Sequence, residues 1–196
     1  AMGDPALLAS KLFNISPPKK KAYSVGIVSH FLEKNSKIFK DLNNNLKNSV
    51  IIDVEQEPLA FIKKILDCET IISTALHPII IADSYGIPNQ WINFSENNVS
   101  KYKFSDYYSV FDERAFYLDL NKIKVTDQTI EKLKQNYKIK DVAGIQKDLI
   151  ESHPFNIKIK KLNAMDALRL KITFYMGGLK FQRVLDAAKT AIKKRL

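Results

Sequence analysis

Residues 70–91, TIISTALHPIIIADSYGIPNQW, contain two apolar runs separated by a short polar link. The first run, 70–73, is short and ends in small hydroxyl residues, which is typical of a buried parallel strand. Pro78 opens the second run, and proline is tolerated in the first turn of a helix because its missing N–H would be unpaired there anyway. Gly86 and Pro88 are stop signals for that helix.

Residues 89–94 are predicted to form the next strand, so the stretch reads as strand, loop, helix, strand. His77 is expected on the loop at the carboxyl end of the first strand. In open α/β sheets this edge is where ligands bind. A helix N-terminus also presents unpaired N–H groups and a positive dipole end, which suits an anion.

The same alternation extends to both sides of this stretch and predicts βαβ units with a parallel sheet. The flanking strands are expected at 23–29 and 50–54. The predicted helices are 4–13, with Asp4 as N-cap, 34–47 and 58–67. After Trp91 the pattern indicates a short helix or loop at 101–112, an edge strand at 116–119, and helices at 127–137 and 141–152.

Charge is distributed unevenly along the 196 residues. The formal net charge is +10, but residues 156–196 hold 11 of the 31 Lys+Arg and only 2 of the 21 Asp+Glu. A balanced body with a basic tail differs from a basic nucleic-acid-binding domain, so we expect no nucleic-acid partner. The sequence predicts two parts: an α/β domain, 1–155, and a basic amphipathic helical tail, 156–196.

Several site classes find no support in the sequence. The single cysteine, Cys68, cannot form an internal disulfide, and no apolar run is long enough for a bilayer; both features favour a cytoplasmic protein. The three histidines lack the spacing of metal ligands, so no metal is expected. There is no Walker loop, no dinucleotide G-x-G-x-x-G and no G-x-S-x-G elbow, and no cofactor is expected.

Five blocks resemble, in order, the polysaccharide pyruvyl transferase family, specifically the exopolysaccharide ketal-pyruvate transferases. Each block alone is weak, and the combination is specific. Together they cover roughly the first 155 residues. The blocks are GDPALL at 3–8, GIVSHF at 26–31, the region 51–77 ending in STALH, IADSYGIPNQW at 81–91 and KFSDYYSVF at 103–111.

The chain departs from the family pattern in two residues and in length. Pro78 stands where the family usually has glycine, and Ala75 stands where some members have arginine. Family members resemble two-lobed, glycosyltransferase-B-like proteins with the active site between the lobes, and the Gly-Asp-Pro block lies near the middle of their chains. The resemblance therefore implies a Rossmann-like C-terminal lobe that supplies one wall of the site, with an N-terminal lobe or a homodimer partner supplying the other.

The resemblance implies transfer of a pyruvyl group from phosphoenolpyruvate to two hydroxyls of a sugar, which forms a pyruvate ketal. The donor's carboxylate and phosphate must be held, a proton must reach the methylene carbon, and the sugar hydroxyls must lose protons. Histidine suits such proton transfer, so His77 is the candidate catalytic residue; the alternative is a loop histidine that caps the backbone. Ser73 and Thr74 are candidate donor-binding residues, or caps of the following helix.

Four further residues are candidates by the same resemblance. His30 follows the first strand, at the same sheet edge as His77, and either lines the donor site or is a satisfied buried histidine. Lys103 is a candidate for the donor's oxygens, or is simply solvated. Asp106 and Tyr107 are candidates for the acceptor sugar, or belong to the cap and core of a short helix. Asp83 is expected to hold packing or a neighbouring loop.

The expected acceptor is a sugar of a lipid-linked or polymeric saccharide, an exopolysaccharide or capsule precursor. The basic tail either rests on an anionic membrane surface or packs on the protein. Two rival functions remain open at this point. One is a glycosyltransferase-B lobe that binds a nucleotide-sugar at the Pro78 helix. The other is a non-catalytic subunit that binds a partner chain.

Overall fold

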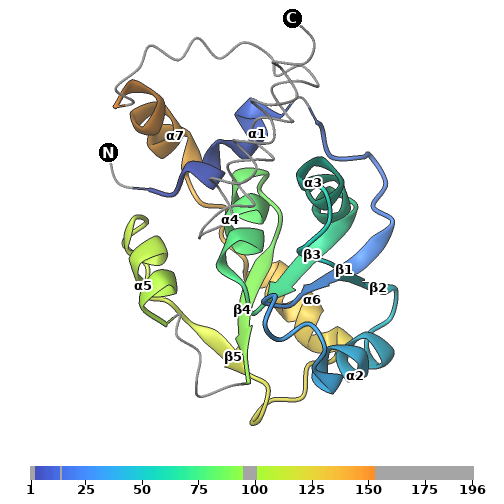
Figure 1. Cartoon of the computed structure of the whole chain (residues 1–196). Helices are drawn as coiled ribbons and strands as arrows, with labels where there is room; N and C mark the ends of the chain where they lie inside the picture. The colour runs from blue at the N-terminus through green and yellow to red at the C-terminus, as the bar shows by residue number, and fades with distance from the viewer. Residues whose placement is uncertain (1–2, 14, 95–100, 153–196) are drawn as a thin grey trace, which may run out of the picture. The chain divides into compact units, whose positions relative to one another are not determined.

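A five-stranded parallel sheet is the centre of the computed structural model, which describes residues 3–13, 15–94 and 101–152. The strand order is β2-β1-β3-β4-β5, and every neighbouring pair is parallel (Figure 1). The predicted α/β, Rossmann-like fold class is thereby confirmed. The strands are β1 Tyr23–Val28, β2 Ser49–Ile52, β3 Cys68–Ser73, β4 Asn89–Asn93 and β5 Tyr117–Asp119.

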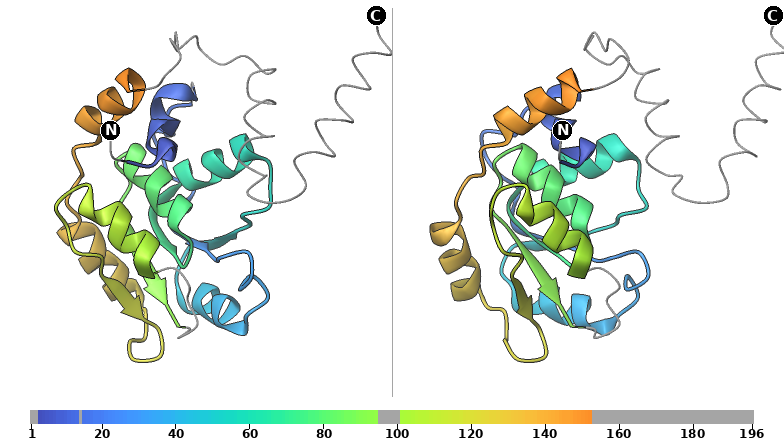
Figure 2. Two further views of the ribbon diagram at one scale, coloured as in Figure 1. Left: turned by 60° about the vertical axis from the view of Figure 1, so that its left-hand side comes forward. Right: turned by 90° about the vertical axis from the view of Figure 1, so that its left-hand side faces the viewer.

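Helices cover both faces of the sheet (Figures 1 and 2). They begin with a short 3₁₀ turn, η1 Pro5–Leu8, for which Asp4 is the N-cap, as predicted; its carboxylate accepts a hydrogen bond of 2.8 Å from the Ala6 N–H. The α-helices are α1 Ala9–Leu12, α2 Lys37–Asn45, α3 Pro58–Leu66, α4 Leu76–Ser84, α5 Lys101–Ser109, α6 Asp127–Asn136 and α7 Val142–Glu151.

Two apolar clusters lie on opposite faces of the sheet, because successive side chains of a strand point to opposite faces. On one face Ile27, Ile72 and Ile92 pack with residues of α2 and α6. On the other face Trp91 packs with Ile79 and Ile80 of α4 and with residues of η1 and α5. Strands that are apolar on both faces are expected in a parallel sheet covered by helices. The core thus fixes α4 and α5 side by side on one face.

Gly26 lets the middle of the sheet pack closely. A Cβ at this position of β1 would lie 2.7 Å from the Ile71 Cδ1 atom and 2.9 Å from both the Cys68 Sγ and the Ile52 Cδ1 atoms. Side chains from both neighbouring strands therefore occupy the space that a larger residue would need.

The prediction was wrong about the start of α4. The helix begins at Leu76, so His77 and Pro78 are its second and third residues, and His77 is not on a loop. Of the segment 101–112, for which a short helix or a loop was predicted, residues 101–109 form α5, and the predicted edge strand is β5. The predicted basic helical tail, 156–196, lies outside the described residues.

Candidate functional site

The topology gives β1 a special position. β2 pairs with one edge of β1, and the chain then crosses over so that β3 pairs with the other edge. The segments that follow β1 and β3 therefore lead away from each other, to opposite sides of the sheet. Ligands of open α/β sheets bind in the crevice outside the carboxyl ends of such a strand pair. The candidate site is therefore built from the residues after Val28 and after Ser73. We call this region the carboxyl-edge site.

Thr74 joins the two strand ends in the carboxyl-edge site. Its N–H donates to the Val28 carbonyl at 3.1 Å, which extends the ladder by one residue. Its hydroxyl oxygen accepts a hydrogen bond from the His30 N–H at 2.8 Å and donates one to the Glu33 carboxylate at 2.5 Å. The side chain is buried. Thr74 therefore fixes the loop that follows β1, which carries His30.

Ser73 shapes the link from β3 to α4. Its hydroxyl oxygen accepts from the Ala75 N–H and donates to the Ala75 carbonyl, both at 2.9 Å. The hydroxyl groups of both Ser73 and Thr74 are therefore hydrogen-bonded to backbone or carboxylate groups of the protein in this structure. Neither hydroxyl caps α4, whose N-cap residue is Ala75, so these contacts are not the predicted helix caps.

The first turn of α4 faces the carboxyl edge with fewer donors than a typical helix N-terminus. Ala75 is the N-cap and has no side chain that could cap the helix. Pro78 has no N–H, so this position offers no hydrogen bond to an anion. The helix dipole remains, and it favours negative charge near Leu76 and His77.

His77 and Asp4 approach each other although 72 residues separate them in the sequence. The Nε2 atom of His77 lies 3.9 Å from the Oδ2 atom of Asp4. The His77 side chain is 63% exposed, whereas that of Asp4 is 31% exposed. An accessible imidazole beside a carboxylate held by its N-cap bond is an arrangement suited to proton transfer. The sequence predicted each residue separately but not that they meet.

His30 is half-buried and follows β1. Its Nδ1 atom accepts a long hydrogen bond of 3.4 Å from the Leu32 N–H, and its ring centroid lies 4.6 Å from that of the exposed Phe31. His30 and His77 therefore follow the carboxyl ends of two neighbouring strands, as predicted.

The three candidates on α5 do not share one environment. Lys103 and Asp106 are exposed, whereas Tyr107 is buried and donates a hydrogen bond of 2.6 Å to the Oδ2 atom of Asp83. The Tyr107 hydroxyl is thus occupied by the protein itself. Of the predicted acceptor-binding pair, only Asp106 presents its side chain to solvent.

Asp83 is the centre of a buried polar cluster that the sequence did not predict. Its carboxylate accepts hydrogen bonds from Asn89 Nδ2 at 2.6 Å, from the Tyr137 hydroxyl at 2.5 Å and from Lys140 Nζ at 3.2 Å, besides that of Tyr107. Burial, and next the Asp83 charge, raise the pKa of Tyr107 and Tyr137 above the usual tyrosine range, so both remain donors.

One sequence signal pointed to this cluster. Asp83 ends an apolar run, and every residue of α4 from Pro78 to Ser84 is buried. A carboxylate on a fully buried helix segment requires partners. Those partners come from β4, from α5 and from the segment between α6 and α7, and their identity depends on tertiary packing. Asn89 opens β4, so this cluster lies at the amino edge of the sheet, opposite the carboxyl-edge site.

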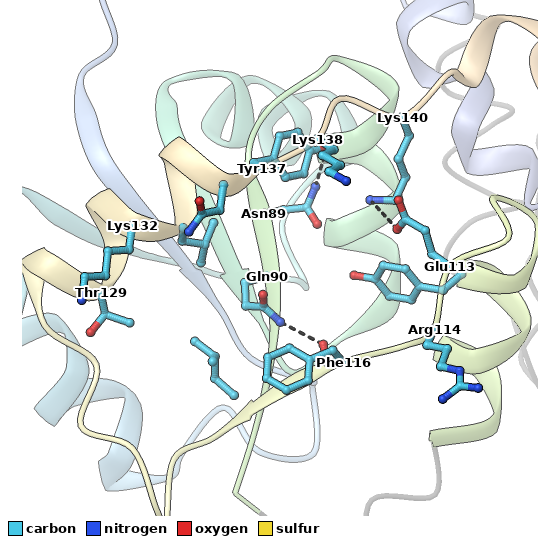
Figure 3. Close-up of a pocket in the computed structure, with 14 residues that line it drawn as sticks. Asn89, Gln90, Glu113, Arg114, Phe116, Thr129, Lys132, Tyr137, Lys138 and Lys140 are labelled. Atoms are coloured by element: carbon cyan, nitrogen blue, oxygen red, sulfur yellow. Dashed lines mark hydrogen bonds and ion pairs between the residues drawn. The ribbon is translucent and has the colours of Figure 1, made fainter.

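A hollow of about 430 Å³ adjoins the cluster at the amino edge (Figure 3). It is bordered by the start of β4, the segment after α5, β5 and α6. Within the described ranges, no three histidine, cysteine or acidic side chains are grouped so that they could hold a metal ion. No helix in the described part of the chain is long and apolar enough to cross a membrane.

Comparison with known proteins adds two findings. The family model described as polysaccharide pyruvyl transferase matches residues 2–96, which include both strand ends of the carboxyl-edge site. The chain is also similar to the uncharacterized protein L143 of Acanthamoeba polyphaga mimivirus, with 31% identity over 114 residues. That alignment covers 56% of this chain but only 39% of the viral protein. No solved structure matches the chain significantly.

Proposed function

Since the chain belongs, through residues 2–96, to the polysaccharide pyruvyl transferase family, we propose that its carboxyl-edge site takes part in transferring a pyruvyl group from phosphoenolpyruvate to a saccharide. The observation that carries the proposal is the meeting of His77 and Asp4 at the start of α4, beside the joined ends of β1 and β3. Asp4 and His77 come from two of the five predicted family blocks, and the end of β1 belongs to a third.

The chemistry requires an anion site and a proton carrier. We propose that the first turn of α4 attracts the phosphate or carboxylate of the donor through the helix dipole. An attacking sugar hydroxyl forms a bond to C2 of phosphoenolpyruvate and loses its proton. The methylene carbon C3 gains a proton and becomes a methyl group. A second hydroxyl bonds to C2, the bond from C2 to the phosphate oxygen breaks, and inorganic phosphate leaves with the remaining proton.

His77 is the proposed proton carrier in these steps, because histidine exchanges a proton near neutral pH and this one is accessible. Asp4 is proposed to orient the imidazole. Lys103 and Asp106 are exposed on α5 and are proposed for the donor and the acceptor sugar, respectively. Tyr107 is proposed to support α5 through Asp83 rather than to contact sugar.

The chain spans less than half of the viral relative that it matches. We therefore propose that the complete active site includes a second wall, supplied by another lobe or by a second copy of this chain. The acceptor is proposed to be a sugar of a lipid-linked or polymeric saccharide, and the reaction is proposed to occur in the cytoplasm.

A non-catalytic binding subunit is the second candidate, and it is favoured by the first turn of α4. Ala75 supplies no side chain to an anion and Pro78 supplies no N–H. Such a subunit would bind a partner chain without binding the donor, which makes donor binding the decisive property.

Calorimetric titration of phosphoenolpyruvate into the full chain tests the proposal. We expect binding that His77→Ala weakens about tenfold, the loss expected for one hydrogen bond to a charged group. Lys40→Gln, an exposed change on α2, is the matched control and should bind as the wild type does. Absence of binding to the wild type would favour the binding subunit. Binding of a UDP-sugar in place of phosphoenolpyruvate would favour a nucleotide-sugar lobe.

A further inference from the structure

The hollow at the amino edge adjoins the last turn of α4, which carries Asp83, whereas His77 is in the first turn of this helix. Its volume of about 430 Å³ falls within the usual range for small-molecule sites. Neither the family match, which ends at residue 96, nor the proposed chemistry involves most of its lining. The lining residues that matter here are Gln90, Arg114, Phe116, Lys132, Asn136 and Lys138.

Three cations border the hollow from separate segments. Arg114 lies in the segment after α5, Lys132 lies on α6, and Lys138 follows α6. All three side chains are exposed, and none forms an ion pair with a carboxylate among residues that the structure describes. Lys140 differs, because its ammonium lies 3.2 Å from Asp83 Oδ1 and 3.8 Å from Glu113 Oε2. The positive charge of the rim is therefore not neutralised, which favours an anionic ligand.

One wall of the hollow combines an aromatic ring with amide groups. Phe116 is 62% exposed, although its carbonyl is fixed by a 2.9 Å hydrogen bond from Gln90 Nε2. Figure 3 draws Gln90 and Phe116 next to each other, joined by this bond. An exposed ring packs well against the C–H face of a sugar, and the amide of Asn136 can bond its hydroxyl groups.

Asn89 adds an unsatisfied acceptor to the same wall. Its Nδ2 atom donates to Asp83 Oδ1 at 2.6 Å and to the Ile87 carbonyl at 3.1 Å, which determines how the amide is oriented. Its Oδ1 atom is buried and accepts no hydrogen bond from any described residue. In Figure 3 this oxygen points away from Tyr137. This oxygen lacks a donor, and a hydroxyl group is the type of partner that would satisfy it.

We propose that this amino-edge hollow is a second ligand site, and that it binds an anionic saccharide of one or two rings. The carboxylate or phosphate of the saccharide lies against Arg114, Lys132 or Lys138, and one ring packs on Phe116. The site is distinct from the carboxyl-edge site and does not depend on the proposed transfer reaction. A saccharide chain held here is anchored to the protein away from His77.

Calorimetric titration of digalacturonate into the full chain tests this proposal, with maltose as the neutral disaccharide of equal length. Inorganic phosphate and AMP are the further probes. We expect digalacturonate to bind more tightly than each of the other three. Arg114→Gln, Lys138→Gln and Phe116→Ala should each weaken binding about threefold, as expected for the loss of one exposed contact. These residues are exposed, so the variants should fold, which circular dichroism checks.

Two control variants establish whether digalacturonate binds in this hollow. Lys40→Gln removes the same charge on α2, outside the hollow, and should leave digalacturonate binding unchanged. His77→Ala should also leave it unchanged, whatever happens to phosphoenolpyruvate binding. The proposal is overturned by no binding of digalacturonate, by equal binding of maltose, by tighter binding of AMP or phosphate, or by an equal effect of Lys40→Gln.

Discussion

Cys68 is enclosed at the start of β3, where its Sγ atom donates to the Lys64 carbonyl at 3.2 Å and its exposed fraction is zero. Burial, and next the charge of Asp67, raise the pKa of this thiol to about 12. Because the thiolate is the nucleophile, Cys68 is expected to be inert in the folded protein. This excludes Cys68 from the chemistry of either site.

The raised pKa of Cys68 also predicts how stability depends on pH. The unfolded thiol loses its proton near pH 9, while the folded thiol keeps it until about pH 12, so stability is lost as the pH rises above 9. At pH 10.5 the thiol should lower the free energy of unfolding by up to about 2 kcal/mol. Urea denaturation at pH 8 and pH 10.5 measures this loss.

The matched variant for this prediction is Cys68→Ala. Buried tyrosines titrate in both proteins, so the difference between the two pH-dependent losses isolates the thiol. Equal losses in wild type and Cys68→Ala would contradict the raised pKa.

Thr74 supports a second prediction for a single residue. Thr74→Val leaves the His30 N–H and the Glu33 carboxylate without their partner, which should cost about 1–3 kcal/mol in the free energy of unfolding. Thr74→Ser keeps the hydroxyl and should cost less. Thermal and urea denaturation of both variants measure the difference. If valine proved as stable as serine, the hydroxyl would not hold the loop after β1.

Contacts between residues far apart in the chain are harder to predict from sequence than local ones. Asp4 was predicted correctly as an N-cap because capping depends on neighbours in sequence. Its approach to His77 depends on the packing of η1 against α4, which no local pattern encodes. Similarly, the sequence suggested ligand binding or helix capping for Thr74, and its hydroxyl instead bonds His30 and Glu33, which lie more than 40 residues away in the chain.

The helix α4 connects the two edges of the sheet at the scale of elements. Its first turn carries His77, and its last turn carries Asp83. The Asp83 cluster ties this last turn to α5 through Tyr107 and to the segment between α6 and α7 through Tyr137 and Lys140. The cluster therefore fixes the far end of the helix that bears the proposed proton carrier.

Breaking this cluster should destabilise the fold. Lys140→Met leaves the buried Asp83 charge without its cation and should cost about 3 kcal/mol in the free energy of unfolding. Asp83→Asn should also destabilise, because among the described residues Glu113, at 3.8 Å, is then the one carboxylate near the Lys140 ammonium. The double variant Asp83→Asn/Lys140→Met should lose less than the sum of the two single losses, since the charges are removed together. Strictly additive losses in urea denaturation would show that the pair is not coupled.

Sequence patterns predicted the elements well and their ends less well. The apolar run after Pro78 correctly indicated a helix, but the helix starts two residues earlier. Proline is compatible with any position of the first turn, so it does not fix the first residue. The helix begins directly after the link in which the Ser73 hydroxyl bonds the backbone of Ala75. The sequence pattern alone does not reveal these hydrogen bonds.

At the scale of the molecule, regular alternation of strands and helices was enough to predict a parallel sheet, and the structure confirms it. The carboxyl-edge site follows from this topology together with the position of His77. The amino-edge hollow could not be predicted from the sequence, because its lining comes from four segments between Asn89 and Lys140 that have no common motif. Thus the sequence predicts the carboxyl-edge site but not the amino-edge hollow.

The most direct test of the central claim is to map phosphoenolpyruvate binding on the ¹H–¹⁵N spectrum of the full chain. We predict that the largest amide shifts fall at 29–31, at 74–77 and at residue 79, and that in His77→Ala about tenfold more phosphoenolpyruvate is needed to produce them. Shifts that gather instead at Gln90, Glu113 and Lys138, with none between Thr74 and Ile79, would contradict the carboxyl-edge site and place the donor at the opposite edge of the sheet.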